Sequence, residues 1–198
     1  MPTLLETLAG QLAGARTGRM SQAIGADQNI TQKALGAALP LLLGALAKNA
    51  GNRDGADALH RAVAKDHDGS ILRDLDGYVG RPDTQTGDGI LRHVLGAKRP
   101  AVEAGISKAS GLDAKGVATM MASLAPLVMG MLGQAQRKQN LDASGLAQML
   151  QVEQQQAATS EPALGGLARL LDSDNDGQIT DDLAKMGSKL LGGLFSKR

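Results

Sequence analysis

Cysteine is absent from the 198-residue chain, and aromatic residues are almost absent, with one tyrosine (Tyr78), one phenylalanine (Phe195) and no tryptophan. Without cysteine the chain has no disulfide, no catalytic thiol and no cysteine-ligated zinc. Strands favour β-branched and aromatic residues, and runs of these residues are missing. The apolar core must therefore come from leucine, alanine, methionine and valine, which predicts an all-α fold.

The chain also lacks an excess of charge of either sign, because it contains 21 basic and 20 acidic residues. A nucleic-acid-binding protein usually has a basic surface and aromatic side chains that stack on bases. We therefore expect no nucleic-acid partner. The first residues show no basic region ahead of an apolar one, so no signal peptide is predicted.

Residues 116–136 contain no charged residue, and this uncharged stretch is long enough for a membrane-spanning helix. The stretch nevertheless contains Thr119, Ser123 and Pro126 and three glycines. A related stretch, residues 34–47, is too short to span a bilayer. Since two related segments should share one environment, buried core helices are favoured over transmembrane helices.

The chain resembles itself when it is shifted by 86 residues. Eleven identities fall between residues 4–46 and their counterparts without a gap, where chance would give roughly four in such a composition. The identical pairs are Leu5/Leu91, Gly10/Gly96, Ala15/Ala101, Ser21/Ser107, Ala23/Ala109, Gly25/Gly111, Asp27/Asp113, Pro40/Pro126, Leu41/Leu127, Gly44/Gly130 and Leu46/Leu132. This pattern predicts a multihelical bundle built from two duplicated units, at about residues 4–50 and 90–136.

Each unit should contain a short helix, a turn at Gly25 or Gly111, and a long apolar helix capped by Asp27 or Asp113. The proline inside each apolar helix should kink it or stand in the first turn of a new helix. Residues 80–89 are predicted as a loop. The duplicated domain covers residues 1–150, residues 151–164 form a polar linker, and residues 165–198 form a tail.

The tail contains the clearest local motif, Asp172-Ser173-Asp174-Asn175-Asp176-Gly177-Gln178. Alternating carboxylates place hard oxygen ligands around one point, and the Gln178 carbonyl would add a further ligand, as in an EF-hand loop. The twelfth position, where such a loop has glutamate, is Leu183 here, so Asp181 and Asp182 are the candidates to close the site. The alternative is a solvated acidic turn that caps a helix.

A helix predicted to begin near Thr180 carries an apolar stripe, and basic residues lie toward its end. The stripe consists of Leu183, Met186, Leu190, Leu191 and Leu194. It requires a surface to cover it, on its own bundle, on a second copy or, less favoured, on an anionic membrane.

Weaker candidate sites are expected to be structural. Asp66-x-Asp68-Gly69 is interpreted as a capping turn rather than a metal site. The histidines His60, His67 and His93 are interpreted as surface or capping residues rather than ligands. A methionine cluster, Met120, Met121, Met129 and Met131, is interpreted as core rather than as a partner-binding surface.

Three stretches resemble a bacterial family, the YidB-like proteins, which are catalogued as a domain of unknown function (937). They are residues 87–99 (GDGILRHVLGAKR), 66–72 (DHDGSIL) and 124–130 (LAPLVMG). The resemblance implies a multihelical bundle in a bacterial, non-secreted and therefore cytoplasmic protein. It implies no activity, catalytic residue or substrate.

Two functions follow as hypotheses. The first is a non-catalytic interaction or scaffold module with a calcium-binding tail, which binds an unidentified protein or associates with itself through apolar helices. The second is a small-ligand-binding protein or enzyme with a pocket between the duplicated halves. In that case Asp88, Arg92 and His93 could face the pocket.

Overall fold

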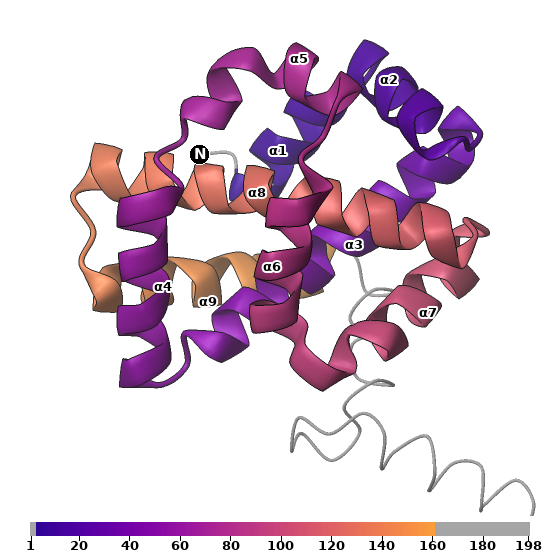
Figure 1. Ribbon diagram of the computed structural model, residues 1–198. Helices are drawn as coiled ribbons and strands as arrows, with labels where there is room; N and C mark the ends of the chain where they lie inside the picture. Colours follow the sequence, from indigo (N-terminus) through magenta and orange to yellow (C-terminus); the bar gives the residue numbers. More distant parts are fainter. Residues whose placement is uncertain (1–2, 161–198) are drawn as a thin grey trace, which may run out of the picture.

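The computed structural model describes residues 3–160, and helices connected by short turns account for the fold of these residues (Figure 1). The all-α prediction is confirmed for this part of the chain, which contains no strand. The elements are α1 (Leu4–Leu12), α2 (Ala15–Ile24), α3 (Gln28–Asn49), α4 (Arg53–Asp66), the 3₁₀ helix η1 (Ser70–Asp74), α5 (Leu75–Gly80), α6 (Thr84–Leu95), the 3₁₀ helix η2 (Gly96–Lys98), α7 (Arg99–Ser110), α8 (Ala114–Gln139) and α9 (Ala143–Ser160).

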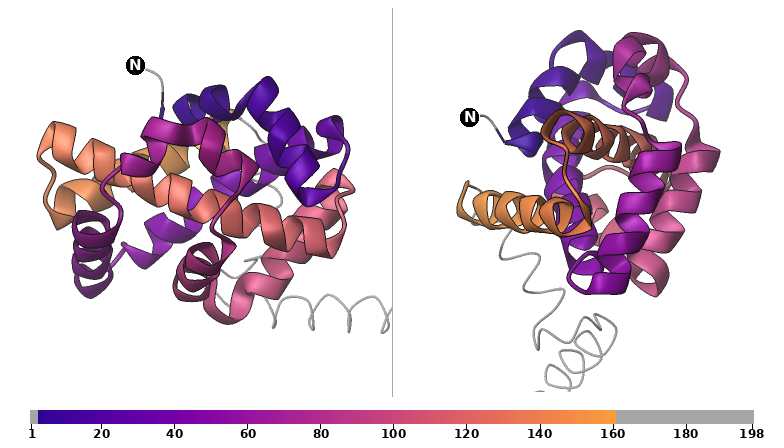
Figure 2. Two further views of the ribbon diagram at one scale, coloured as in Figure 1. Left: turned by 45° about the horizontal axis from the view of Figure 1, so that its top comes forward. Right: turned by 90° about the vertical axis from the view of Figure 1, so that its left-hand side faces the viewer.

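Helix α8 is the centre of the bundle, and most of the other helices pack against it (Figures 1 and 2). From Met120 to Gly133 every residue of this helix is buried. A helix that is apolar all round is stable only when protein surrounds it. The four methionines at positions 120, 121, 129 and 131 are at most 6% exposed, so their assignment to the core is confirmed.

Helices α3 and α8 are each long and apolar enough to cross a membrane. In the most apolar window of α8, however, 89% of the residues are buried inside the bundle, against 56% for α3. Core helices of soluble proteins meet the same criterion of length and composition. The packing of α8 is that of a core helix, and the fold is compatible with a soluble protein.

The predicted capping residues occupy their positions. Asp27 accepts the N–H of Asn29 at 2.7 Å at the start of α3, and Asp113 accepts the N–H of Gly116 at 2.6 Å at the start of α8. Gly25 and Gly111 end the preceding helices with positive φ, at 70° and 81°. These helix boundaries fall 86 residues apart. Superposition of the two units in space stays a prediction.

One expectation about helix limits is narrowed, and a second needs correction. Pro40 and Pro126 stand inside continuous helices, so of the two predicted alternatives a new helix start at proline is excluded, and a kink stays a prediction. Residues 80–89 are not a loop, because α6 begins at Thr84. Asp83 starts that helix by accepting the N–H and the hydroxyl of Thr86, at 3.1 and 2.7 Å.

The glycines that suggested a loop instead set the distance between α6 and α8. A Cβ atom on Gly87 would overlap the carbonyl oxygen of Ala122, so only glycine allows the two backbones to approach this closely. Gly133 does the same for α8 against the His67 carbonyl oxygen. Gly89, two residues further along α6, has open space around it.

Gly87→Ala should therefore destabilise the protein by about 2–4 kcal/mol, because the added methyl group must push α6 away from α8. Gly89→Ala is the matched control on the same helix. It should leave the stability unchanged or raise it by up to about 1 kcal/mol, since alanine is the better helix former. Urea unfolding followed by circular dichroism measures both, and equal stabilities of the two variants would contradict the close-approach argument.

Helix α9 extends to Ser160 and so covers most of the stretch predicted as a linker. Its glutamines and alanines are good helix formers, and Glu153 and Ala157 are 92% buried on its inner face. The Glu153 carboxylate accepts the N–H groups of Leu4 and Leu5, at 2.8 and 3.2 Å. A buried carboxylate thus satisfies the first free donors of α1, where the helix dipole favours negative charge.

Glu153→Gln should destabilise the protein by about 1–2 kcal/mol, because the amide has one acceptor oxygen and no charge. Gln155→Ala, on the exposed face of α9, is the control and should change stability by less than about 0.5 kcal/mol. Hydrogen exchange should show faster exchange at the start of α1 in Glu153→Gln alone. Unchanged exchange there would mean that the carboxylate does not hold α1.

Candidate functional site

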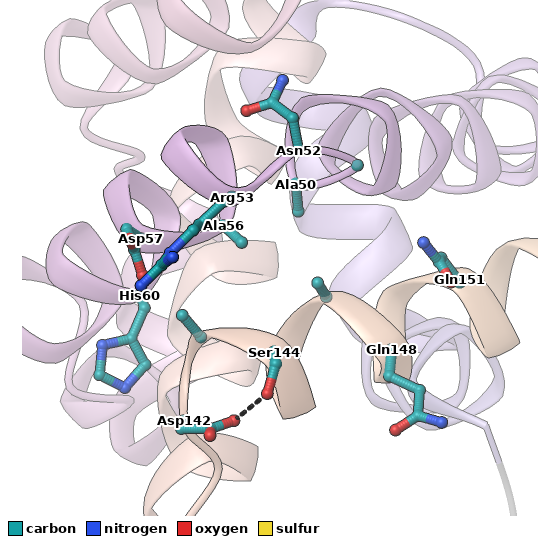
Figure 3. Close-up of a pocket in the computed structure, with 13 residues that line it drawn as sticks. Ala50, Asn52, Arg53, Ala56, Asp57, His60, Asp142, Ser144, Gln148 and Gln151 are labelled. Carbon is teal, nitrogen blue, oxygen red and sulfur yellow. Dashed lines mark hydrogen bonds between the residues drawn. The ribbon is translucent and has the colours of Figure 1, made fainter.

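A groove lies between the α3–α4 turn, α4 and the first half of α9 (Figure 3). Its volume is about 850 Å³, and it is open to solvent. Helices α4 and α9 lie close together near His60 and Asp142 and diverge toward Asn52 and Gln151. The lining residues are Ala50, Gly51, Asn52, Arg53, Ala56, Asp57, His60, Asp142, Ala143, Ser144, Ala147, Gln148 and Gln151.

The groove combines small apolar side chains with polar ones. Alanines at positions 50, 56, 143 and 147 leave room for a second backbone to approach. The side chains of Arg53 and Asp57 make no hydrogen bond or ion pair with any other residue that the structure describes. The groove therefore presents one positive and one negative side chain, Arg53 and Asp57, without a partner among the described residues, beside an apolar surface.

His60 joins three elements at the narrow end of the groove. Its Nε2 atom lies 3.2 Å from the carbonyl oxygen of Leu141 and 2.7 Å from Nε2 of Gln136, on α8. Gln136 is 8% exposed, and its Oε1 atom has no hydrogen-bond partner. Turning the Gln136 amide by 180° would place this oxygen opposite His60 Nε2, which could then donate to both carbonyl oxygens.

Asp142 fixes the beginning of α9 beside His60. Its Oδ1 atom accepts the N–H of Gly145 at 2.7 Å and the hydroxyl of Ser144 at 2.8 Å. The hydrogen bond from the Gly145 N–H lowers the pKa of this carboxyl group most, and the Ser144 hydroxyl and the electrostatic effect of His60 lower it further. Asp142 is therefore a negatively charged group of the groove at neutral pH.

The groove is suited to binding a chain segment. Its alanines can contact apolar side chains, while its amides and charged groups can bind polar ones. Among residues 3–160, no group of three or more histidine, aspartate or glutamate side chains is placed to hold a metal ion.

The predicted calcium loop, with Asp172, Asp174, Asp176, Gln178, Asp181 and Asp182, lies outside the described residues. The Asp66–Gly69 segment is a capping turn, as predicted. Asp68 accepts the N–H of Ser70 at 2.9 Å, and Gly69 has a φ of 80°. Burial lowers the pKa of His67 in this turn, and the opposing effect of Asp66 is smaller.

The residues proposed for a pocket between the halves are not in the groove. Asp88 binds Arg99 at 2.6 Å, and Arg99 also binds Glu103 at 2.6 Å. Arg92 and His93 are exposed in the last turn of α6. Where α6 meets α8, the helices pack closely around Gly87.

The groove could not be predicted from sequence motifs. Its residues come from three separate elements, and no sequence motif joins these elements. The one available signal was Asp142-x-Ser144-Gly145, which is a capping pattern and indicates only where a helix begins.

His60→Ala should destabilise the protein by about 1–3 kcal/mol, because the buried Gln136 amide would lose its described partner. His93→Ala removes an exposed histidine and should change stability by less than about 0.5 kcal/mol. Thermal unfolding at pH 7.5 compares the two variants. If both melt like the parent protein, the His60–Gln136 contact contributes nothing to the stability of the α4–α8–α9 junction.

A family model described as "Bacterial protein of unknown function (DUF937)" matches residues 6–135. No curated protein and no solved structure matches the chain. Helix α9, which forms one wall of the groove, follows the matched residues.

Proposed function

The chain belongs to a family of bacterial proteins of unknown function, DUF937, and we propose that it is a non-catalytic interaction protein with a calcium-binding C-terminal loop. The family supplies no reaction, so the proposal rests on the chain's own residues. The observation that carries it is the pairing of a groove suited to a chain segment with an Asp-rich loop followed by an amphipathic stretch.

The groove supports the interaction role. Its charged side chains Arg53 and Asp57 are uncommitted within the described residues, and its alanines present a small apolar surface. The partner would be a protein segment, from another protein or from a second copy of this chain. A cytoplasmic location is part of this proposal.

The loop at residues 172–178 supports calcium binding by ligand chemistry. Three aspartates at alternate positions and one carbonyl oxygen provide the hard oxygen ligands that calcium prefers. The missing glutamate at the twelfth position removes a bidentate ligand, so the affinity should be low. Calcium would neutralise the like charges of the three aspartates, and we expect it to stabilise the start of the helix predicted from near Thr180.

Calcium should bind to the full chain with a dissociation constant of about 10⁻⁴–10⁻³ M, the range of weak loops. Isothermal titration measures the affinity, and limited proteolysis should show that calcium protects residues 165–198. Asp174→Ala should abolish both effects because it removes a central ligand.

Asp54→Ala is the matched control, since it removes an exposed aspartate of α4 that makes no described side-chain bond. It should bind calcium like the parent protein. If millimolar calcium gives neither heat nor protection, the loop is only a helix cap and the calcium proposal fails.

A further inference from the structure

The groove between α4 and α9 is an open binding surface on a chain that also carries an amphipathic stretch with no assigned surface. The stretch, residues 183–198, has the apolar stripe Leu183, Met186, Leu190, Leu191 and Leu194. We infer that residues 183–198 of the same chain bind in the α4–α9 groove and cover it. This inference goes beyond the proposed function and does not depend on calcium binding.

Charge complementarity supports this occupant. The charged residues of the groove, apart from His60, are Arg53, Asp57 and Asp142, with a net charge of −1 (one positive, two negative). Residues 183–198 contain Lys185, Lys189, Lys197 and Arg198 and no acidic residue, so their net side-chain charge is +4. Opposite charges around an apolar contact both orient the two surfaces and favour their association.

The small side chains of the groove also leave room for the larger side chains of the stripe. Small residues allow a helix to approach another backbone closely, and the groove has alanines at positions 50, 56, 143 and 147. The leucines of the stripe can fill the space that these small side chains leave. Asp57 and Asp142 would then lie beside the lysines that flank the stripe.

The length of the connection permits the contact. Helix α9 forms one wall of the groove and ends at Ser160, nine residues or about 14 Å beyond Gln151. Residues 161–182 separate Ser160 from Leu183, and 22 residues can reach up to roughly 70 Å. A tethered segment binds at a high effective concentration, so even a weak contact can be well populated.

The absence of cysteine from the chain allows a direct test by spin labelling. Labels are attached at Arg61→Cys, an exposed position on α4 outside the groove, and at Ser188→Cys, off the apolar stripe. Double electron–electron resonance of the doubly labelled full chain in EDTA should give one narrow peak in the distribution of distances between the two labels. A broad distribution in the parent protein would overturn the inference.

Charge reversal tests which residues form the contact. Asp57→Lys and Lys189→Glu should each remove most of the narrow peak, and the two substitutions together should restore it. Asp54→Lys is the matched control, because Asp54 lies on α4 but outside the groove, and it should leave the peak unchanged. Lys189→Glu lies outside the described bundle, so its result does not depend on how well α4 tolerates substitution. A peak that survives both single reversals would overturn the inference.

Two further occupants are distinguished by the same labels. If a mixture of singly labelled chains gives the narrow peak, the segment binds a second copy and the intramolecular inference is wrong. If the peak is absent and the full chain binds vesicles of anionic phospholipid, the stripe faces a membrane and the inference is also wrong. Because these measurements are made in EDTA, failure of the calcium proposal does not affect them.

Discussion

Burial of α8 is the constraint on which the rest of the structure depends. This helix contains fourteen consecutive buried residues, Met120 to Gly133. Such a helix cannot present a polar face to water, so other helices must surround it. Helices α1, α2, α3, α4, α6 and α7 all contact it.

Close packing around α8 is possible because small residues stand where backbones meet. Gly87 allows α6 to reach the Ala122 carbonyl oxygen, and Gly133 allows the turn after α4 to reach the same helix. Large aromatic side chains, which usually fill the gaps between helices, are almost missing from this chain. Tyr78 is an exception: it packs against the core and donates its hydroxyl to the Ser123 carbonyl oxygen at 3.1 Å. Glycine and alanine therefore allow the helix backbones to approach closely. Dispersion contacts between these backbones take the place of contacts between aromatic rings.

Features determined by neighbouring residues could be predicted from the sequence, whereas features determined by distant ones could not. Asp27 and Asp113 cap their helices as predicted, since a cap depends only on the next few residues. Gly87 was misread as a loop residue because its role depends on Ala122, on another helix. The stretch predicted as a linker contains Glu153, which gave no local signal for the same reason: its partners Leu4 and Leu5 lie at the other end of the chain. The groove, which is assembled from three elements, gave no local signal, and the calcium loop stays a prediction.

Helix α9 contributes both to the core of the bundle and to the groove, whereas α8 contributes only to the core. Its inner face buries Leu146 and Leu150 and places Glu153 at the start of α1. Its beginning forms a wall of the groove and is held beside α4 by Leu141 and His60. Helix α9 follows residues 6–135, which match the family model. The matched residues therefore contribute only α4 and the α3–α4 turn to the groove. A change that loosens α9 would therefore open the groove and free the start of α1 together, while the packing of α6 and α7 on α8 would stay in place.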